Sequence, residues 1–267
     1  MAKLVTTFPA AREFQRALAR LDALGLPHEA TTAAPGYALV GSGAVVVEDE
    51  ARMELESRGG ADFVTSGWTD WHAEPWRVPG DPPREFAEPV FRSCAVMVLA
   101  PCVADGTKIR VTAHLAGDLA PVFPYMNAEM TWASYNPNGP NFTYLDGTRM
   151  VALYPARITI AKADGIVDAW RILDGIRVRA NDAWARRAEI EPSWEIREKP
   201  PALEIFRRLP RTNCRACGEA TCLAFAAKVW MGPARPSGCV PVFEGAFGEL
   251  KDALVDICRA LGTEQGL

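Results

Sequence analysis

Apolar positions in the first 67 residues alternate between a helical and a strand-like period. Between residues 10 and 24 they recur every three or four positions, which predicts an amphipathic helix that Gly25 ends. Residues 48–58 predict a second helix, and three short runs rich in branched side chains predict strands. These strand predictions fall on residues 4–8, 37–40 and 44–47. The pattern therefore indicates a small α/β domain over residues 1–67.

The next segment, residues 68–89, breaks this pattern. It carries five prolines, each of which removes a backbone hydrogen-bond donor, so neither a continuous helix nor a central strand is expected. It also carries Trp68, Trp71 and Trp76, which we expect to pin the segment to a domain surface or to contact a partner. We interpret residues 68–89 as a linker rich in proline and tryptophan.

Residues 90–198 have the pattern of an α+β domain. Apolar runs at 93–100 and 108–114 predict strands, and Asp146-Gly147 separates two aromatic-rich runs in the manner of a β-hairpin turn. From Ile166 to Trp184 the apolar residues form one stripe at helical spacing, which predicts a long helix facing the core. The overall fold class expected is α+β.

The last segment, residues 199–267, is set apart by its cysteines. Cys214, Cys217, Cys222 and Cys239 are separated by two, four and sixteen residues. Residues 219–231 predict a helix with Cys222 in its first turn, where free backbone N–H groups favour a thiolate. Residues 247–261 predict a terminal helix that carries Cys258 in a core position. We therefore assign residues 199–267 to a small cysteine-containing domain with a terminal helix.

Composition and charge limit the class of protein, the partners and the cellular location to expect. Hydrophobic residues make up 49% of the chain and charged residues 23%, which is typical of a globular protein. A net charge of -4 gives no reason to expect nucleic acid as a partner. The N-terminus lacks the apolar core of a secretory signal, and the apolar run at 94–104 is too short for a membrane helix. We expect a cytoplasmic protein without membrane insertion, in which reduced cysteines serve metal or redox chemistry.

Four thiolates suit two kinds of metal site. Structural zinc accepts four cysteines, but its usual frameworks contain two C-x2-C knuckles, and only Cys214 and Cys217 form one here. An iron–sulfur cluster also binds four thiolates, and its larger core suits one short spacing combined with wider ones. The spacing favours the cluster over zinc and does not separate a [4Fe-4S] from a [2Fe-2S] centre.

The segment LPRTNCRACGEATCLAFAAKVWMG, followed by a later Gly-Cys, resembles a four-cysteine [4Fe-4S] domain family. That family occurs in the large subunit of the corrinoid iron–sulfur protein and in the B subunit of the Rnf electron-transport complex. The resemblance covers residues 207–245 and implies that Cys214, Cys217, Cys222 and Cys239 bind a [4Fe-4S] cluster. It also implies electron transfer in anaerobic metabolism.

Residues 1–67 resemble, more distantly, a selenium- or sulfur-carrier-like domain family, through the first strand and the segments FPAAREFQRALARL and GLPHEATTAAPG. A carrier of this kind needs a thiol, and residues 1–67 contain no cysteine. The resemblance therefore bears on the fold of this region and not on its chemistry.

The functional hypothesis is electron transfer to or within a larger anaerobic metalloenzyme system, with a protein redox partner. Full cysteine ligation leaves no iron open for substrate, and the sequence contains none of the common phosphate-loop, dinucleotide, nucleophile-elbow or zinc-protease motifs. We therefore expect a redox accessory protein rather than a stand-alone enzyme. Two alternatives remain open: a maturation factor using the spare Cys94 and Cys102, and a small-molecule site around residues 126–141.

Overall fold

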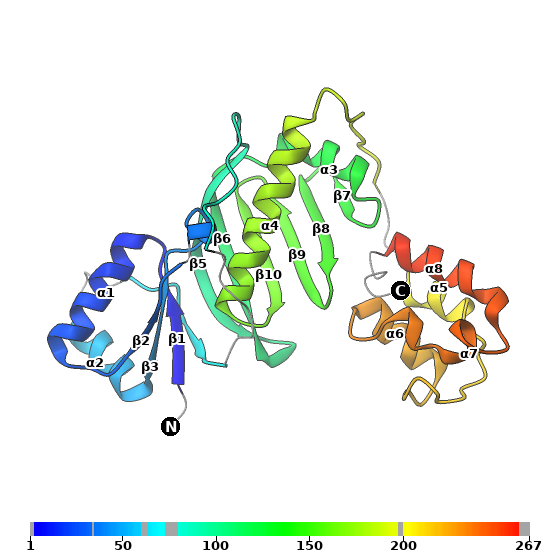
Figure 1. Cartoon of the computed structure of the whole chain (residues 1–267), viewed down its shortest axis with the longest axis horizontal. Coiled ribbons are helices and arrows are strands. Elements are labelled where there is room, and N and C mark those ends of the chain that lie inside the picture. The colour runs from blue at the N-terminus through cyan, green and yellow to red at the C-terminus, as the bar shows by residue number, and fades with distance from the viewer. Residues whose placement is uncertain (1–2, 34, 60–63, 73–79, 197–199, 262–267) are drawn as a thin grey trace. The chain divides into compact units, whose positions relative to one another are not determined.

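The computed structural model describes residues 3–33, 35–59, 64–72, 80–196 and 200–261 (Figure 1). It has a mixed α+β architecture with two antiparallel sheets and a helical, cysteine-containing C-terminal region, as the sequence predicts. By contacts the chain forms two compact units. One comprises residues 1–126 and 153–191, and the other comprises residues 127–152 and 192–267.

The strands of the first sheet have the order β2-β3-β1-β4, and those of the second have the order β5-β6-β10-β9-β8-β7. The bounds in the first sheet are β1 Lys3–Thr7, β2 Glu29–Thr31, β3 Ala44–Glu48 and β4 Trp68–Asp70. The bounds in the second are β5 Phe91–Cys102, β6 Asp105–Gly117, β7 Ser134–Asn136, β8 Asn141–Asp146, β9 Arg149–Tyr154 and β10 Arg157–Ala163.

Eight α-helices and several short 3-10 turns lie in the described residues. The helices are α1 Ala11–Leu24, α2 Asp49–Gly59, α3 Phe123–Glu129, α4 Ile166–Ala185, α5 Ala202–Arg207, α6 Cys222–Met231, α7 Val240–Phe243 and α8 Lys251–Ala260. The 3-10 turns are η1 Pro35–Tyr37, η3 Ala120–Val122, η4 Pro236–Gly238 and η5 Gly248–Leu250.

The first sheet follows the predicted pattern at α1, α2, β1 and β3, whereas the strands β2 and β4 were not predicted. α1 places its apolar stripe in the core and ends at Gly25, whose φ of 63° is accessible to glycine without a Cβ clash. The strand predicted at 37–40 is wrong. Pro35 begins a 3-10 turn there, and the N–H groups of Val40 and Gly41 donate to the carbonyl of Tyr37 at 2.9 and 2.8 Å. These local bonds replace a strand ladder.

The segment at 68–89 begins inside this sheet. Trp68–Asp70 forms the edge strand β4, paired antiparallel with β1, and Trp68 packs against the hydrophobic core formed by α1, α2 and β3. Trp76 lies outside the described residues. The tryptophan at the start of this segment is therefore part of the sheet, whereas all five prolines of the segment follow after β4.

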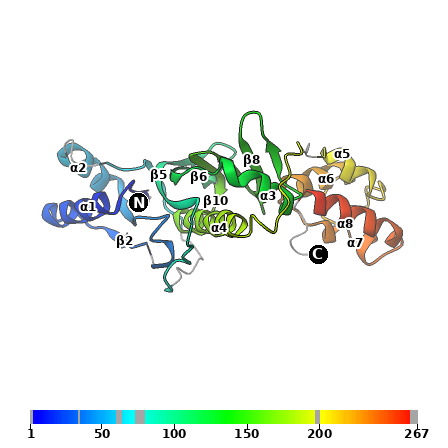
Figure 2. The same ribbon diagram turned by 90° about the horizontal axis from the view of Figure 1, so that it is seen from above.

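The second sheet contains the predicted hairpin and carries the predicted long helix. β8 and β9 are neighbours joined at Gly147, which has a φ of 61°. α4 lies against the face of β5 and β10, as two views show (Figures 1 and 2). The side chain of Asn181 in α4 accepts from the N–H of Phe91 at 2.9 Å and donates to its carbonyl at 2.8 Å. This fixes the helix to the start of β5.

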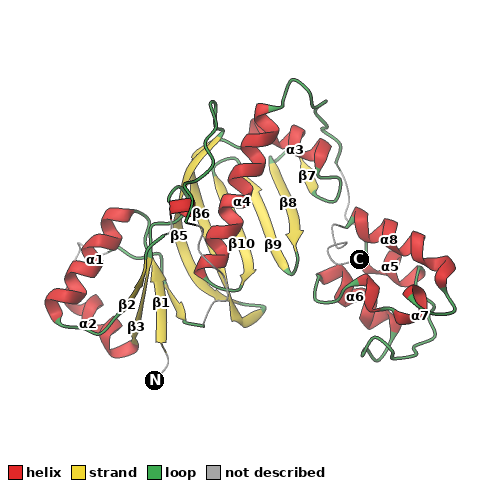
Figure 3. Cartoon of the chain, viewed as in Figure 1, coloured by secondary structure: helices red, strands yellow, loops and turns green. Residues whose placement is uncertain are grey.

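The described part of the C-terminal region, residues 200–261, consists of helices and loops without a strand (Figure 3). α5, α6 and α8 surround a small core that contains buried cysteines as well as aliphatic and aromatic side chains. Nowhere in the described chain is a helix long and apolar enough to cross a membrane.

Candidate metal centre

The four cysteines of the C-terminal motif line one recess in this helical region. Helix α6 begins at Cys222, and Thr221 caps it by accepting from the N–H of Ala224 at 3.0 Å. The helix was predicted to begin at residue 219, but residues 219–221 are irregular, and Thr221 has the extended conformation of an N-cap. Cys222 is therefore the first helical residue, and the helix N-terminus lies beside its thiol.

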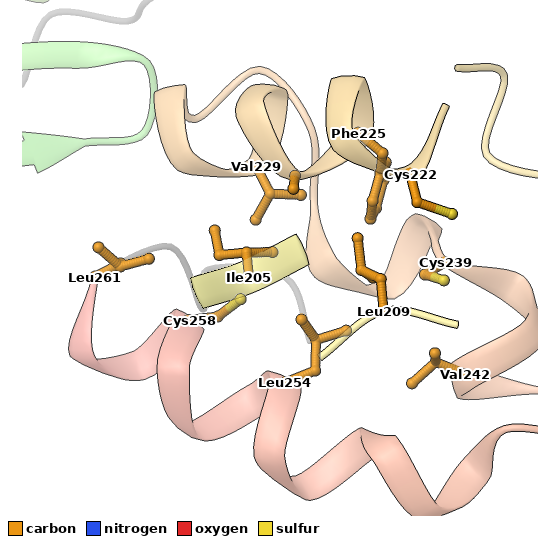
Figure 4. Packing of buried hydrophobic residues seen from close by; sticks show 11 residues of the cluster. Ile205, Leu209, Cys222, Phe225, Val229, Cys239, Val242, Leu254, Cys258 and Leu261 are labelled. Atoms are coloured by element: carbon orange, nitrogen blue, oxygen red, sulfur yellow. The ribbon is translucent and has the colours of Figure 1, made fainter. Parts of the chain in front are cut away.

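Two of the four thiols belong to the hydrophobic core. Cys222 and Cys239 are 8% and 6% exposed, and both lie near Phe225 and Leu209 at one end of the core (Figure 4). Cys217 is half-buried against the same core, and Cys214 is exposed. The recess is thus covered by helices on the side of Cys222 and Cys239 and reaches solvent at Cys214.

The loop that carries the first two cysteines has an unusual backbone. Arg211, Asn213 and Arg215 have φ values of 60°, 51° and 62°, and Gly218 has a φ of 81°. A left-handed conformation costs a non-glycine residue roughly 1–2 kcal/mol, although asparagine tolerates it better than arginine. Alternating left-handed residues can turn successive N–H groups toward one concavity, an arrangement found at many iron–sulfur sites. The loop therefore bears strain at the place where anionic sulfurs gather.

Asn213 ties this loop to helix α6. Its Oδ1 accepts from the N–H of Cys222 at 2.9 Å, which joins the residue before the first cysteine to the third cysteine. One side chain thereby sets the position of two different parts of the recess. Sequence reasoning did not single out Asn213, although its place directly before Cys214 and its tolerance of positive φ were available signals.

Cys239 reaches the recess from a returning loop. The turn η4 positions it, with the Cys239 N–H donating to the carbonyl of Pro236 at 3.1 Å, and Cys239 then precedes α7. Burial raises the pKa of the Cys239 thiol, and the backbone N–H of Val242 opposes this by favouring the thiolate. The neighbouring charges of Cys222, Cys217 and Cys214 raise that pKa further, because a thiolate is disfavoured beside other anions.

The donor set fits a metal group bound by sulfur. Four thiols converge on the recess, and Glu219, which also lines it, forms an ion pair with Lys228 at 2.6 Å. All seven cysteines of the chain are free thiols. Within the described ranges, no three histidine, cysteine, aspartate or glutamate side chains form a ready-made site for a single metal ion. A bound metal group would neutralise the thiolates and so remove the mutual repulsion of the sulfurs.

The other cysteines lie apart from this recess. Cys258, in α8, is fully buried between Ile205 and Leu254 (Figure 4), as expected for a core residue. Cys102 is 5% exposed, and burial raises the pKa of the half-buried Cys94 to about 12. A cavity of about 380 Å³ adjoins residues 131–134 and 143–145, but neither Tyr135, Asn136 nor Cys102 lines it.

Comparisons with known proteins point to the same segment. Residues 209–241 match the family model described as "Putative Fe-S cluster". The gamma subunit of the acetyl-CoA decarbonylase/synthase complex of Methanosarcina acetivorans is 48% identical over 62 residues, which cover 23% of this chain and 13% of that subunit. Gamma subunit 2 of the same complex from Methanosarcina thermophila is 50% identical over 40 residues, or 15% of this chain and 8% of that subunit.

The corrinoid/iron-sulfur protein large subunit of Moorella thermoacetica is 45% identical over 51 residues, covering 19% of this chain and 11% of that protein. The matched stretch thus spans less than a sixth of each of these relatives. No solved structure matches the chain. Residues 209–241 therefore match an iron–sulfur cluster family, and part of the chain is similar to segments of the corrinoid/iron-sulfur and decarbonylase/synthase gamma subunits.

Proposed function

We propose that Cys214, Cys217, Cys222 and Cys239 bind one [4Fe-4S] cluster and that the protein transfers single electrons to or within a larger anaerobic metalloenzyme system. The observation that carries the proposal is the convergence of four thiols on one recess inside the segment that matches an iron–sulfur family. A [4Fe-4S] cluster bound there would accept and release one electron at a potential set by its surroundings.

The protein's own residues supply the environment for that exchange. Cys222 and Cys239 lie in an apolar core that limits water on one side, while the exposed Cys214 leaves the other side accessible. The left-handed loop and the N-terminus of α6 favour negative charge in the recess. Four cysteine ligands leave no open coordination position, so the arrangement suits electron transfer better than substrate activation.

A larger complex as partner is suggested by the relatives. The gamma subunits with similar segments are named as parts of an acetyl-CoA decarbonylase/synthase complex. The similarity covers only 23% of this chain, so a partner for this chain would be recognised by its own remaining surface. A maturation role, the alternative, would use spare thiols, but Cys102 is buried and the thiol of Cys94 has a pKa near 12, which leaves it protonated and unreactive at neutral pH.

The test is anaerobic purification of the full chain, followed by iron, sulfide and zinc analysis and electron paramagnetic resonance before and after dithionite reduction. We expect about four irons and four sulfides per chain and a reversible signal from the reduced cluster. Stoichiometric zinc without iron would overturn the proposal and leave a structural zinc domain. A cluster that moves intact to an added apo-protein, instead of cycling, would favour the maturation role.

A further inference from the structure

The four cysteines differ in their access to solvent. Cys222 and Cys239 are covered by the helical core, Cys217 is half-buried, and Cys214 is exposed. Electron transfer between proteins weakens steeply with distance, so a partner has to approach the uncovered side. Resting on the proposed function, we propose that an electron-carrier protein docks at Cys214 and presents carboxylates to Arg211 and Arg215. This surface of Cys214, Arg211 and Arg215 is called the Cys214 face.

The charges around the recess distinguish these two arginines from their neighbours. Lys228 forms an ion pair with Glu219 at 2.6 Å, and Arg208 with Glu204 at 2.8 Å. Arg211 and Arg215 are exposed and have no ion-pair partner among the described residues. Two cations on either side of an exposed cysteine are therefore available to bind carboxylates of another protein.

The backbone adds a second argument for a role of these side chains. Both arginines occupy left-handed positions, with φ values of 60° and 62°, where glycine or asparagine would meet less strain. Asn213, between them, is a residue that tolerates this conformation. The chain thus places arginine at two positions where the backbone alone disfavours it. That placement fits side chains used for contact.

Two apolar side chains that follow cysteines of the motif in sequence are also exposed. Leu223, directly after Cys222, and Val240, directly after Cys239, are 49% and 43% exposed. Transient redox complexes use small interfaces, in which a few apolar contacts are surrounded by a polar, charged rim. Arg211 and Arg215 supply charges of the kind found in such a rim.

The sign of the partner's charge can be tested because the net charge of the chain and the charge of the Cys214 face favour carriers of opposite sign. A net charge of -4 would by itself favour a basic carrier. Exposed charges are screened beyond about 8–10 Å at physiological salt, so the nearest charges decide a docked complex. The arginines of the Cys214 face would be the nearest to a partner seated there. The proposal therefore predicts a preference opposite to the one expected from net charge.

The experiment mixes the dithionite-reduced full chain, with iron and sulfide content already measured, with two oxidised carriers in a stopped-flow instrument. The probes are an acidic plastocyanin and a basic c-type cytochrome. One electron passes from the reduced protein to each carrier, converting Cu(II) to Cu(I) or Fe(III) to Fe(II). At low ionic strength we expect the second-order rate constant to be higher for plastocyanin and to fall as salt is added.

Variants then locate the effect. The double variant Arg211→Gln/Arg215→Gln should lower the plastocyanin rate constant about tenfold at low ionic strength and flatten its salt dependence. Arg211→Lys/Arg215→Lys should retain most of the rate, because lysine keeps the charge. The matched control, Arg259→Gln, removes an exposed arginine of α8 outside the recess and should leave the rate unchanged.

A faster reaction with the basic cytochrome, or a plastocyanin rate that the double glutamine variant leaves unchanged, would overturn the Cys214 face while leaving the cluster proposal intact. Absence of iron and sulfide before mixing would instead overturn the proposed function, and this inference with it. The metal analysis therefore separates the two failures.

Discussion

The first sheet and the C-terminal region are both small, yet they are stabilised in different ways. The first has a core of aliphatic and aromatic side chains from α1, α2 and the strands, with no cysteine in residues 1–67. The C-terminal core contains three buried cysteines among its apolar residues and adjoins a loop with three left-handed non-glycine residues. Burial of apolar area accounts for the stability of the first sheet and its helices. In the C-terminal region, thiols occupy core positions and the backbone of the cysteine loop is strained.

A bound metal group is expected to matter for the stability of the C-terminal region and not for that of the first sheet. A region of about 60 residues has a marginal core and commonly needs a disulfide or a metal. The C-terminal region has free thiols in place of disulfides. We expect its fold to depend on the metal group and the first sheet to be independent of it. Three measurements test this difference, and a fourth tests a separate source of stability in the unit that contains the first sheet.

The largest effect is expected from removing a buried ligand. Cys222→Ser should abolish cluster binding, because the hydroxyl is a poor iron ligand and the site loses one of its two buried thiols. Iron content and visible absorption measure the loss. Cys258→Ala, which removes a buried thiol outside the recess, should keep its iron. Equal iron in both variants would contradict the ligand assignment.

Removal of the metal group by a chelator under anaerobic conditions should have the next largest effect. Hydrogen exchange in residues 209–241 should accelerate by about 10³-fold or more, because metal-binding free energy is folding free energy in such regions. Exchange in β1 and β3 should not change. Exchange that stays slow in the C-terminal region would show that its apolar core suffices without metal.

A smaller effect is expected from the tie between the cysteine loop and α6. Asn213→Ala loses the hydrogen bond to the Cys222 N–H and places alanine at a positive φ, at a combined cost of about 2 kcal/mol. Cluster loss to a chelator should then be faster. Asn213→Gly, which relieves only the backbone, should recover part of the difference. If the Asn213→Ala variant and the unchanged protein lose the cluster at the same rate, the hydrogen bond from Cys222 to Asn213 does not stabilise the cluster.

The smallest effect concerns the unit that contains the first sheet. Burial raises the pKa of Cys94 from 9.0 to about 12, so the folded protein keeps a proton that the unfolded chain releases above pH 9. Stability from this source is full below pH 9 and is lost as the pH rises toward 12. At pH 10 we expect a loss of about 1 kcal/mol, given that the side chain is only half-buried. Cys94→Ala should remove that part of the pH dependence in denaturant unfolding, and an unchanged slope would contradict it.

The sequence predicted most elements because their signals are local. α1, the β8–β9 hairpin and α4 each rest on a periodic pattern and a defined turn or cap residue. The prediction at 37–40 was wrong because Tyr37 and Val40 have strand propensity, while Pro35 and the tertiary setting favour a turn. The start of α6 was misplaced by three residues because the cap at Thr221 outweighs the composition of residues 219–221.

For the candidate site, sequence spacing identified the four cysteines but not their surroundings. The unequal exposure of Cys214 and Cys239 depends on how α6, α7 and α8 pack, which no local pattern encodes. The link from Asn213 to Cys222 joins residues nine positions apart and follows from left-handed φ values that sequence alone does not reveal. Tertiary packing, rather than residue type, makes these four thiols different from one another.

The wide separation between Cys222 and Cys239 has a consequence that polymer physics describes. A metal group bound to all four thiols would cross-link the chain at four points. It would close two short loops, between Cys214 and Cys217 and between Cys217 and Cys222, and one long loop that contains α6 and η4. Chain entropy released on opening a loop grows with its length, and for a loop of this size the constraint is worth about 3 kcal/mol. Release of the bond to Cys239 would thus open the longest loop and give the largest gain in chain entropy. We therefore expect this bond to break first when the metal group is lost.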